Sequence, residues 1–206
     1  MRKERKMANK VHPQALIPSA PCYFTSKQET FTIWMKSLVL SGKGCTVFDS
    51  DGHVVYRVDN YNCKDSNQVH LMDFKGHVLF TFFKKKFKLL DCWDGYRASG
   101  NDEIDRKKPG FQVRRKFRLS GHACRAVVRS DQNQSRQYSI ESNWTSKSTC
   151  RIADKAGVLI AEVKRKQSEN GVVLGEDVLT MVVEPSMDHS LIMALLVVYN
   201  LIISRM

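Results

Sequence analysis

The chain has 206 residues, 42% of them hydrophobic, which is ordinary for a globular protein and sufficient for one domain with a sizeable core. Lys and Arg number 33 against 21 Asp and Glu, a net charge of +12. Such an excess suggests a polyanionic partner (nucleic acid, anionic lipid or an acidic protein) unless it serves solubility alone. The basic first residues are not followed by an apolar segment, which argues against a secretory signal.

The six cysteines are widely spaced and form no C-x-x-C pair. Without a secretory signal, this pattern favours a reducing, intracellular compartment in which the thiols serve as small apolar core residues. We therefore expect a cytoplasmic protein, with the membrane periphery or the nucleus as alternatives.

Residues 1–29 contain three of the five prolines and little periodicity, so we predict a flexible N-terminal arm there. From residue 30 the hydrophobic pattern alternates with a period of two, which is typical of half-buried strands. A single folded domain is therefore expected over 30–206.

Strands are expected at 30–40, 45–48, 53–58, 68–74, 77–83, 87–92, 96–99, 111–119, 122–129, 136–143, 149–153, 158–166 and 177–183. Glycine-containing turn signals, which tolerate positive φ, separate several of them, at 49–52, 75–76, 94–95 and 120–121. Short connections between about twelve strands predict an antiparallel, meander-like sheet.

The segment 188–204 is apolar on every side and predicts a helix buried in protein or in lipid, with Asp188 or Ser186 capping its start. Its apolar part rises only roughly 20 Å, which is short for a bilayer span, although a membrane tail anchor is the alternative. About twelve strands close at a radius of roughly 12 Å, which leaves room for one helix. The predicted fold is therefore mostly β: a closed antiparallel β-barrel around a central C-terminal helix. Its core residues are expected to be Leu191, Ile192, Leu195, Leu196, Val198, Tyr199 and Ile202.

A basic surface is predicted between residues 81 and 118, where twelve Lys and Arg stand against five Asp and Glu. Phe82, Phe83 and Phe87 flank its lysine run, as a loop that inserts beside lipid headgroups requires; alternatively, they point into the barrel. Each basic residue near an anionic surface contributes about 1 kcal/mol of binding energy. The candidate headgroup-binding residues are Lys84, Lys85, Lys86, Lys88, Arg106, Lys107, Lys108, Arg114, Lys116 and Arg118.

Along 111–119 the side chains alternate between the two faces of the expected strand. Val113, Phe117 and Leu119 form the inward series, opposite the basic residues that face water. Arg115 falls in the inward series, and the sequence offers no reason for its position.

No motif indicates metal binding or catalysis. Asp49-Ser50-Asp51-Gly52 lacks the glycine and glutamate spacing of a calcium loop and predicts a hairpin turn. The six histidines are isolated, and no nucleophile signature is present. We expect no enzyme activity, cofactor, metal or small-molecule substrate.

Four segments carry a resemblance to a known family: FTIWMKSL at 31–38, GKGCTVF at 42–48, VYRVDNY at 55–61 and VHLMD at 69–73. They closely resemble the plant LURP-one-related family, and the likeness runs from about residue 11 to the end of the chain. That family is similar in fold to the tubby C-terminal domain and the phospholipid scramblases, which implies a twelve-stranded barrel around a C-terminal helix.

The resemblance implies less about function. Founding members are linked to basal defence, and no enzymatic activity or ligand comes with the motif. Tubby domains bind phosphoinositides through a surface Lys/Arg pocket, but no motif here carries those residues over, and the acidic calcium segment of scramblases has no match.

We therefore expect a non-enzymatic binding or tethering module whose basic face docks on anionic phospholipid, phosphoinositide-like, in a plant defence or stress setting. The alternatives are a nucleic-acid-associated transcription regulator of the membrane-tethered tubby-like type, or a scaffold for an acidic protein.

Overall fold

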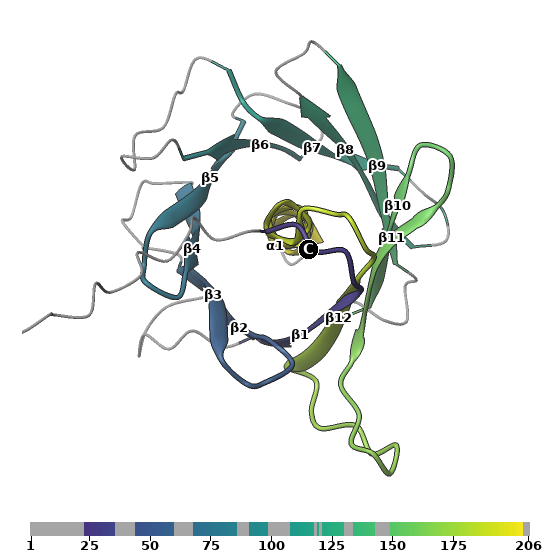
Figure 1. Ribbon diagram of the computed structural model, residues 1–206. Coiled ribbons are helices and arrows are strands. Elements are labelled where there is room, and N and C mark those ends of the chain that lie inside the picture. The colour runs from purple at the N-terminus through teal and green to yellow at the C-terminus, as the bar shows by residue number, and fades with distance from the viewer. Residues whose placement is uncertain are drawn as a thin grey trace, which may run out of the picture.

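The computed structural model describes residues 23–35, 44–59, 68–85, 91–98, 108–117, 119, 121–129, 134–142 and 149–203. Twelve antiparallel strands follow one another around a closed barrel, and the last pairs with the first (Figure 1). They are β1 (Glu29–Trp34), β2 (Gly44–Phe48), β3 (Val54–Asp59), β4 (Gln68–Asp73), β5 (Val78–Lys84), β6 (Cys92–Arg97), β7 (Phe111–Lys116), β8 (His122–Arg129), β9 (Ser135–Ser142), β10 (Cys150–Asp154), β11 (Leu159–Arg165) and β12 (Val178–Val183).

One helix, α1 (His189–Ile203), lies along the axis of this barrel (Figure 1). Its side chains are buried on nearly every face, because inward residues of the surrounding strands pack against it. Of the helix residues expected in the core, Leu191 is half-buried and the others are fully buried. The predicted fold class, a closed barrel of twelve strands around a C-terminal helix, is confirmed. No helix among the described residues has the length and apolarity that crossing a bilayer requires.

The two ends of the barrel are distinguished by α1. Connections that follow even-numbered strands lie at the proximal end, where α1 begins, and Arg97 at the end of β6 pairs there with Asp188. Connections that follow odd-numbered strands lie at the distal end, where α1 finishes. Tyr199 in α1 donates a hydrogen bond of 2.6 Å to the hydroxyl of Ser142, the last residue of β9.

The start of α1 is capped, and a preceding segment of the chain is joined to it. The Asp188 carboxylate accepts hydrogen bonds from the Leu191 amide (3.1 Å) and the Ser190 hydroxyl (2.5 Å), as predicted for the cap. The His189 amide donates to the carbonyl of Tyr23 (3.0 Å), which lies within the segment predicted as a flexible arm. Residues 23–28 therefore pack at the proximal end; the remainder of that segment lies outside the described residues.

Three proximal hairpins share one construction. In each, an aspartate carboxylate at the end of the first strand, or just after it, accepts two backbone N–H bonds across the turn, at 2.8–3.0 Å for Asp49, 2.9 Å for Asp73 and 2.8–2.9 Å for Asp154. A glycine three residues later has a φ of 84–89°, which other residues rarely adopt: Gly52, Gly76 and Gly157. The hairpins predicted at 49–52 and 75–76 are therefore confirmed.

The hairpin predicted at 94–95 is wrong. Asp94 and Gly95 lie in the middle of β6, which runs unbroken from Cys92 to Arg97. Glycine is required there by packing rather than by a turn, because a Cβ on Gly95 would lie 2.2 Å from Cζ of the Phe111 ring. Local turn chemistry cannot reveal a ring contributed by the neighbouring strand.

The predicted inward series on 111–119 is correct only for its first part. Val113 is fully buried, but β7 ends at Lys116, and Phe117 and Leu119 are 87% and 88% exposed. Arg115 is half-buried at the distal rim, where its amide donates to the Asp91 carbonyl (3.0 Å). The inward position of Arg115 is therefore at the open end of the barrel, where the side chain reaches solvent.

Candidate functional site

The predicted basic surface is only partly covered by the described residues. Lys86, Lys88, Arg106, Lys107 and Arg118 lie outside them, as does Phe87. The residues that can be placed are Lys84, Lys85, Lys108, Arg114 and Lys116.

The lysines at the end of β5 are neutralised by aspartates. The Lys84 ammonium lies 2.6 Å from the Asp91 carboxylate, and the Lys85 ammonium lies 2.9 Å from that of Asp94. Because each lysine–aspartate pair has no net charge, these lysines add little to the electrostatic attraction of an anion. Their role is therefore structural at least in part.

Phe82 and Phe83, the described phenylalanines beside these lysines, do not form a membrane-inserting loop. Phe82 is fully buried inside the barrel, and Phe83 is half-buried, with its ring centre 5.6 Å from that of Tyr96. The alternative interpretation, in which the phenylalanines are packing residues, applies to both.

Lys108 is separated from the other candidates. It precedes β7 at the proximal end, whereas Lys116 ends β7 at the distal rim. The six residues of β7 span roughly 17 Å at ~3.4 Å per residue. The structure therefore brings Arg114 and Lys116 together, without Lys108.

Arg114 is held by a chain of polar contacts on the outer wall. Its Nε donates to the amide oxygen of Gln112 (2.7 Å), and the amide nitrogen of Gln112 donates to the Asp94 carboxylate (2.6 Å). Asp94 is only 4% exposed and is also paired with Lys85. Because one edge of the guanidinium is fixed by Gln112, its terminal amino groups are presented in a preset orientation.

Arg125, which the sequence prediction missed, lies directly opposite Arg114 on β8. Both side chains are exposed, and neither has a carboxylate within ion-pair distance in the described part of the chain. Like charges in opposite positions of a sheet destabilise it by about 0.2–1 kcal/mol. The predicted Ser120-Gly121 turn carried no signal for this pair, because a register counted outward from it would place residue 127, and not Arg125, opposite Arg114.

An apolar tip adjoins this arginine pair. The connection between β7 and β8 lies at the distal end, immediately after Lys116, and carries the exposed side chains of Phe117 and Leu119. Arg114 is two residues, or about 7 Å, from Lys116 along the strand. Exposed large apolar side chains next to uncompensated cations are the composition of a membrane-contacting loop.

The Cys92 thiol borders the same arginine, in register with it across β6 and β7. Burial raises the pKa of this thiol and Asp94 raises it further, whereas Arg114 and Lys85 act in the opposite direction. The thiol is therefore protonated at neutral pH, and it does not act as an anionic partner for Arg114.

A second apolar tip occurs on the distal connection between β11 and β12, which projects from the barrel (Figure 1). Its exposed residues are Val172, Val173 and Leu174. At the base of this tip, Arg165 pairs with Glu176 (3.6 Å), whereas Lys166 donates to the hydroxyl of Thr32 (2.6 Å), which does not neutralise its charge. This tip therefore adjoins one uncompensated cation, whereas Arg114, Lys116 and Arg125 lie near Phe117.

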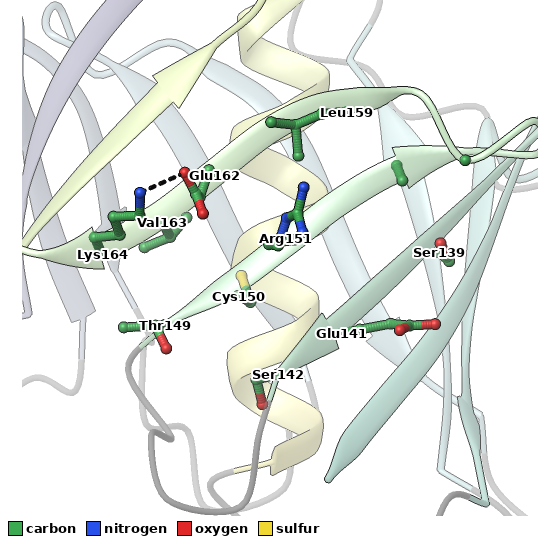
Figure 2. Close-up of a pocket in the computed structure, with 12 residues that line it drawn as sticks. Ser139, Glu141, Ser142, Thr149, Cys150, Arg151, Leu159, Glu162, Val163 and Lys164 are labelled. Atoms are coloured by element: carbon green, nitrogen blue, oxygen red, sulfur yellow. Dashed lines mark ion pairs between the residues drawn. The ribbon is translucent and has the colours of Figure 1, made fainter. Parts of the chain in front are cut away.

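A cavity of about 750 Å³ lies on the barrel wall formed by β9, β10 and β11 (Figure 2). β9 and β10 pair only as far as Glu141 and Arg151, and beyond that point Ser142 and Cys150 also line the cavity. Burial raises the pKa of the Cys150 thiol to about 12, so it is neutral.

The charges around this cavity cancel. Two carboxylates and two cations line it, and Lys164 pairs with Glu162 at 2.7 Å. Arg151 lies between Glu141 and Glu162 in the register of the sheet. A polyanion gains nothing from a site of zero net charge, so the arginine pair on β7 and β8 is the better candidate for the anionic partner.

One exposed hairpin gathers possible metal ligands. Ligand atoms of Asp49, Asp51 and His53 lie within 4.8 Å of one another. The Asp49 carboxylate already accepts the amides of Asp51 (3.0 Å) and His53 (2.8 Å), as hairpin formation requires. The turn accounts for this arrangement without an ion.

Comparisons with known proteins bear on the family and the fold. A model of the LURP-one-related family matches residues 29–200. Protein LURP-one-related 11 of Arabidopsis thaliana is 46% identical over 94% of this chain and 88% of its own length. Protein LURP-one-related 3 of the same plant is 45% identical over 87% of this chain and 82% of its own length, and protein LURP-one-related 8 is 34% identical over 93% and 96%.

A solved X-ray structure of an Arabidopsis thaliana protein shares the fold. It has a TM-score of 0.57 and 15% sequence identity, and the match covers 86% of this chain and 93% of that one. At this identity the likeness concerns the fold alone. The family match spans most of the barrel and its helix, and relatives with 34–46% identity extend over nearly the whole chain, so this protein belongs to the LURP-one-related family.

Proposed function

We propose that this chain is a non-enzymatic tethering module that docks on anionic phospholipid membranes through its distal end. The observation that supports this function is the juxtaposition, on β7 and β8, of uncompensated arginines with an exposed apolar tip. The arginines attract anionic headgroups, and the apolar side chains enter the region between headgroups and acyl chains. A plant defence or stress setting is part of the proposal, and it rests on the family resemblance.

The two contributions are comparable in size. Arg114, Arg125 and Lys116 together contribute about 3 kcal/mol near an anionic surface, at ~1 kcal/mol each. Burying Phe117 and Leu119 in the interface adds roughly 3–6 kcal/mol, before the cost of association. Neither contribution alone gives stable membrane binding. Lipid-anchored proteins likewise need two membrane-binding features, such as one acyl chain and one basic patch.

Flotation with liposomes tests the apolar contribution. The double variant Phe117→Ser/Leu119→Ser should lose flotation with vesicles that contain anionic lipid, and its fold should persist because both side chains are exposed. Phe74→Ser is the matched control, since Phe74 is 59% exposed on a proximal hairpin at the opposite end of the barrel. Equal flotation of these two variants would contradict docking through the distal end.

The same assay tests the electrostatic contribution. Lys116→Glu should reduce flotation on anionic vesicles and leave the weak background on neutral vesicles unchanged, because only the attraction to headgroup charge is reversed. Lys155→Glu, an exposed lysine on a proximal hairpin, makes the same charge change far from the proposed surface. If Lys155→Glu has as large an effect, then net charge alone determines binding. Preference for a particular DNA sequence over anionic vesicles would favour a nucleic-acid function instead.

A further inference from the structure

We infer that Arg114 and Arg125 together bind one phosphomonoester dianion, and that Gln112 and Asp94 position Arg114 for it. This inference rests on the proposed membrane function and deepens it, because it names the headgroup chemistry. The same chemistry also occurs in soluble phosphate monoesters, so the site can be examined with and without a membrane.

The electrostatics of the arginine pair favour a bound anion. Directly opposite residues in an antiparallel pair have Cβ atoms about 4.5–5.5 Å apart, so the two guanidinium groups repel each other. No carboxylate in the described residues relieves that repulsion for either arginine. A bound anion shared by both groups removes the conflict, and each arginine can form two parallel hydrogen bonds to phosphate oxygens.

The charge and the hydrogen-bond donors of the arginine pair match those of a phosphomonoester. A phosphomonoester carries about −1.5 to −2 charges at pH 7 and three acceptor oxygens. Two arginines supply a charge of +2 and several N–H donors in planar forks. A phosphodiester, such as that of phosphatidylserine or duplex DNA, has one charge and two free oxygens, so it leaves the arginine repulsion only half compensated.

Arg114 is held in place before any ligand binds. The Nε of Arg114 is bonded to Gln112, whose amide group is in turn fixed by the buried carboxylate of Asp94. The negative charge of Asp94 is offset by Lys85 at 2.9 Å, so this carboxylate holds Gln112 with little repulsion of an incoming anion. A side chain ordered before binding loses less conformational entropy when the ligand arrives.

Inositol 1,4,5-trisphosphate titrated into the full chain by calorimetry is the soluble probe, with glycerophosphoinositol as the phosphodiester counterpart. The trisphosphate should bind and the diester should bind at least about tenfold more weakly. Arg114→Gln and Arg125→Gln should each weaken trisphosphate binding by about tenfold or more. Arg151→Gln is the matched control, because Arg151 is also an exposed strand arginine but borders the cavity of zero net charge.

Gln112→Met tests the positioning role, since methionine has similar length but can neither donate to Asp94 nor accept from Arg114. It should weaken trisphosphate binding severalfold, and it should leave the Phe117- and Leu119-dependent flotation on phosphatidylserine vesicles unchanged. Gln112→Glu should weaken trisphosphate binding further, because its carboxylate would pair with Arg114 and neutralise the charge that attracts the anion. A thermal melt of each variant verifies that the barrel is intact.

Vesicles of equal surface charge, containing either phosphatidylserine or phosphatidylinositol 4,5-bisphosphate, complete the test. Soluble trisphosphate binding without flotation on either vesicle would retain the arginine site and refute membrane docking. A different result would retain membrane docking and overturn the arginine site. In that result, flotation is equal on both vesicles, and Arg114→Gln cannot be distinguished from Arg151→Gln in either assay. Tighter binding of duplex DNA than of the trisphosphate would also overturn the arginine site.

Discussion

The packing of β6 against the Phe111 ring of β7 can be tested most sharply at Gly95. A methyl group at this position would lie 2.2 Å from Cζ and 2.4–2.5 Å from both Cε atoms of the Phe111 ring. The ring cannot easily move away, because Phe111 is 1% exposed and packs against both Phe80 and Phe82, whose ring centres lie 5.8 and 6.0 Å from its own. Gly95→Ala should therefore destabilise the protein by about 1–3 kcal/mol through overpacking.

Gly110→Ala is the matched control. An added methyl group there would approach no atom closer than 3.7 Å, which is ordinary van der Waals contact. Its effect on the free energy of unfolding should be within about 0.5 kcal/mol. Urea denaturation at equilibrium measures both variants, and for a chain of this size each 1 kcal/mol corresponds to about 2–4 °C in the thermal midpoint.

A second substitution identifies the cause of the Gly95→Ala effect. Phe111→Leu alone should destabilise the core, but combined with Gly95→Ala it should cost less than the sum of the single changes, because the smaller side chain relieves the clash. If the two changes are additive, or if Gly95→Ala is as mild as Gly110→Ala, the reasoning from ring contact is refuted.

Three other outcomes follow from the interior of the barrel. Deletion of 189–206 should leave an insoluble, unfolded chain. Burial of the helix side chains contributes a gross free energy of roughly 15–30 kcal/mol, at roughly 1.5–3 kcal/mol each, whereas the net stability of a protein is typically about 5–15 kcal/mol. A truncated chain that is soluble, and folded by circular dichroism, would contradict this. Tyr199→Phe should cost about 1–3 kcal/mol in urea denaturation, since the buried Ser142 hydroxyl loses its partner, whereas combining it with Ser142→Ala should restore part of that loss. Burial raises the pKa of three thiols from 9.0 to about 12, so in this range the folded state keeps protons that the unfolded state releases. The free energy of unfolding should therefore fall as pH rises from 9 toward about 12. A flat profile across this range would contradict this expectation. These thiols belong to Cys45, Cys124 and Cys150.

The architecture was predictable because its signals are local and repeated. The apolar run 188–204 has no polar face, so only burial accounts for it, and its length fits a barrel axis better than a bilayer. Turns such as Asp49–Gly52 carry their own hydrogen-bonding carboxylate and their own left-handed glycine. Neither inference requires knowledge of distant contacts.

The errors occurred where a distant residue decides the outcome. Gly95 looks like a turn residue until Phe111 of the next strand is placed over it. Phe117 continues an alternating pattern, but alternation has no structural meaning after the strand has ended at Lys116.

The candidate site was harder to predict than the fold for the same reason. Net charge indicated a basic surface but could not show that Lys84 and Lys85 are neutralised by Asp91 and Asp94. The register that places Arg125 against Arg114 is a property of strand pairing rather than of composition.

The order of elements along the chain has a consequence for biosynthesis. The wall begins at β1, but the helix that fills it follows β12, and closure of the wall joins residues as distant as Glu29 and Val183. At about 5–20 residues per second, the ribosome takes roughly 8–30 s to proceed from the end of β1 to the start of α1. During that interval the inward faces of nascent strands have no core to cover them, so chaperone occupancy should be greatest before α1 emerges from the ribosome.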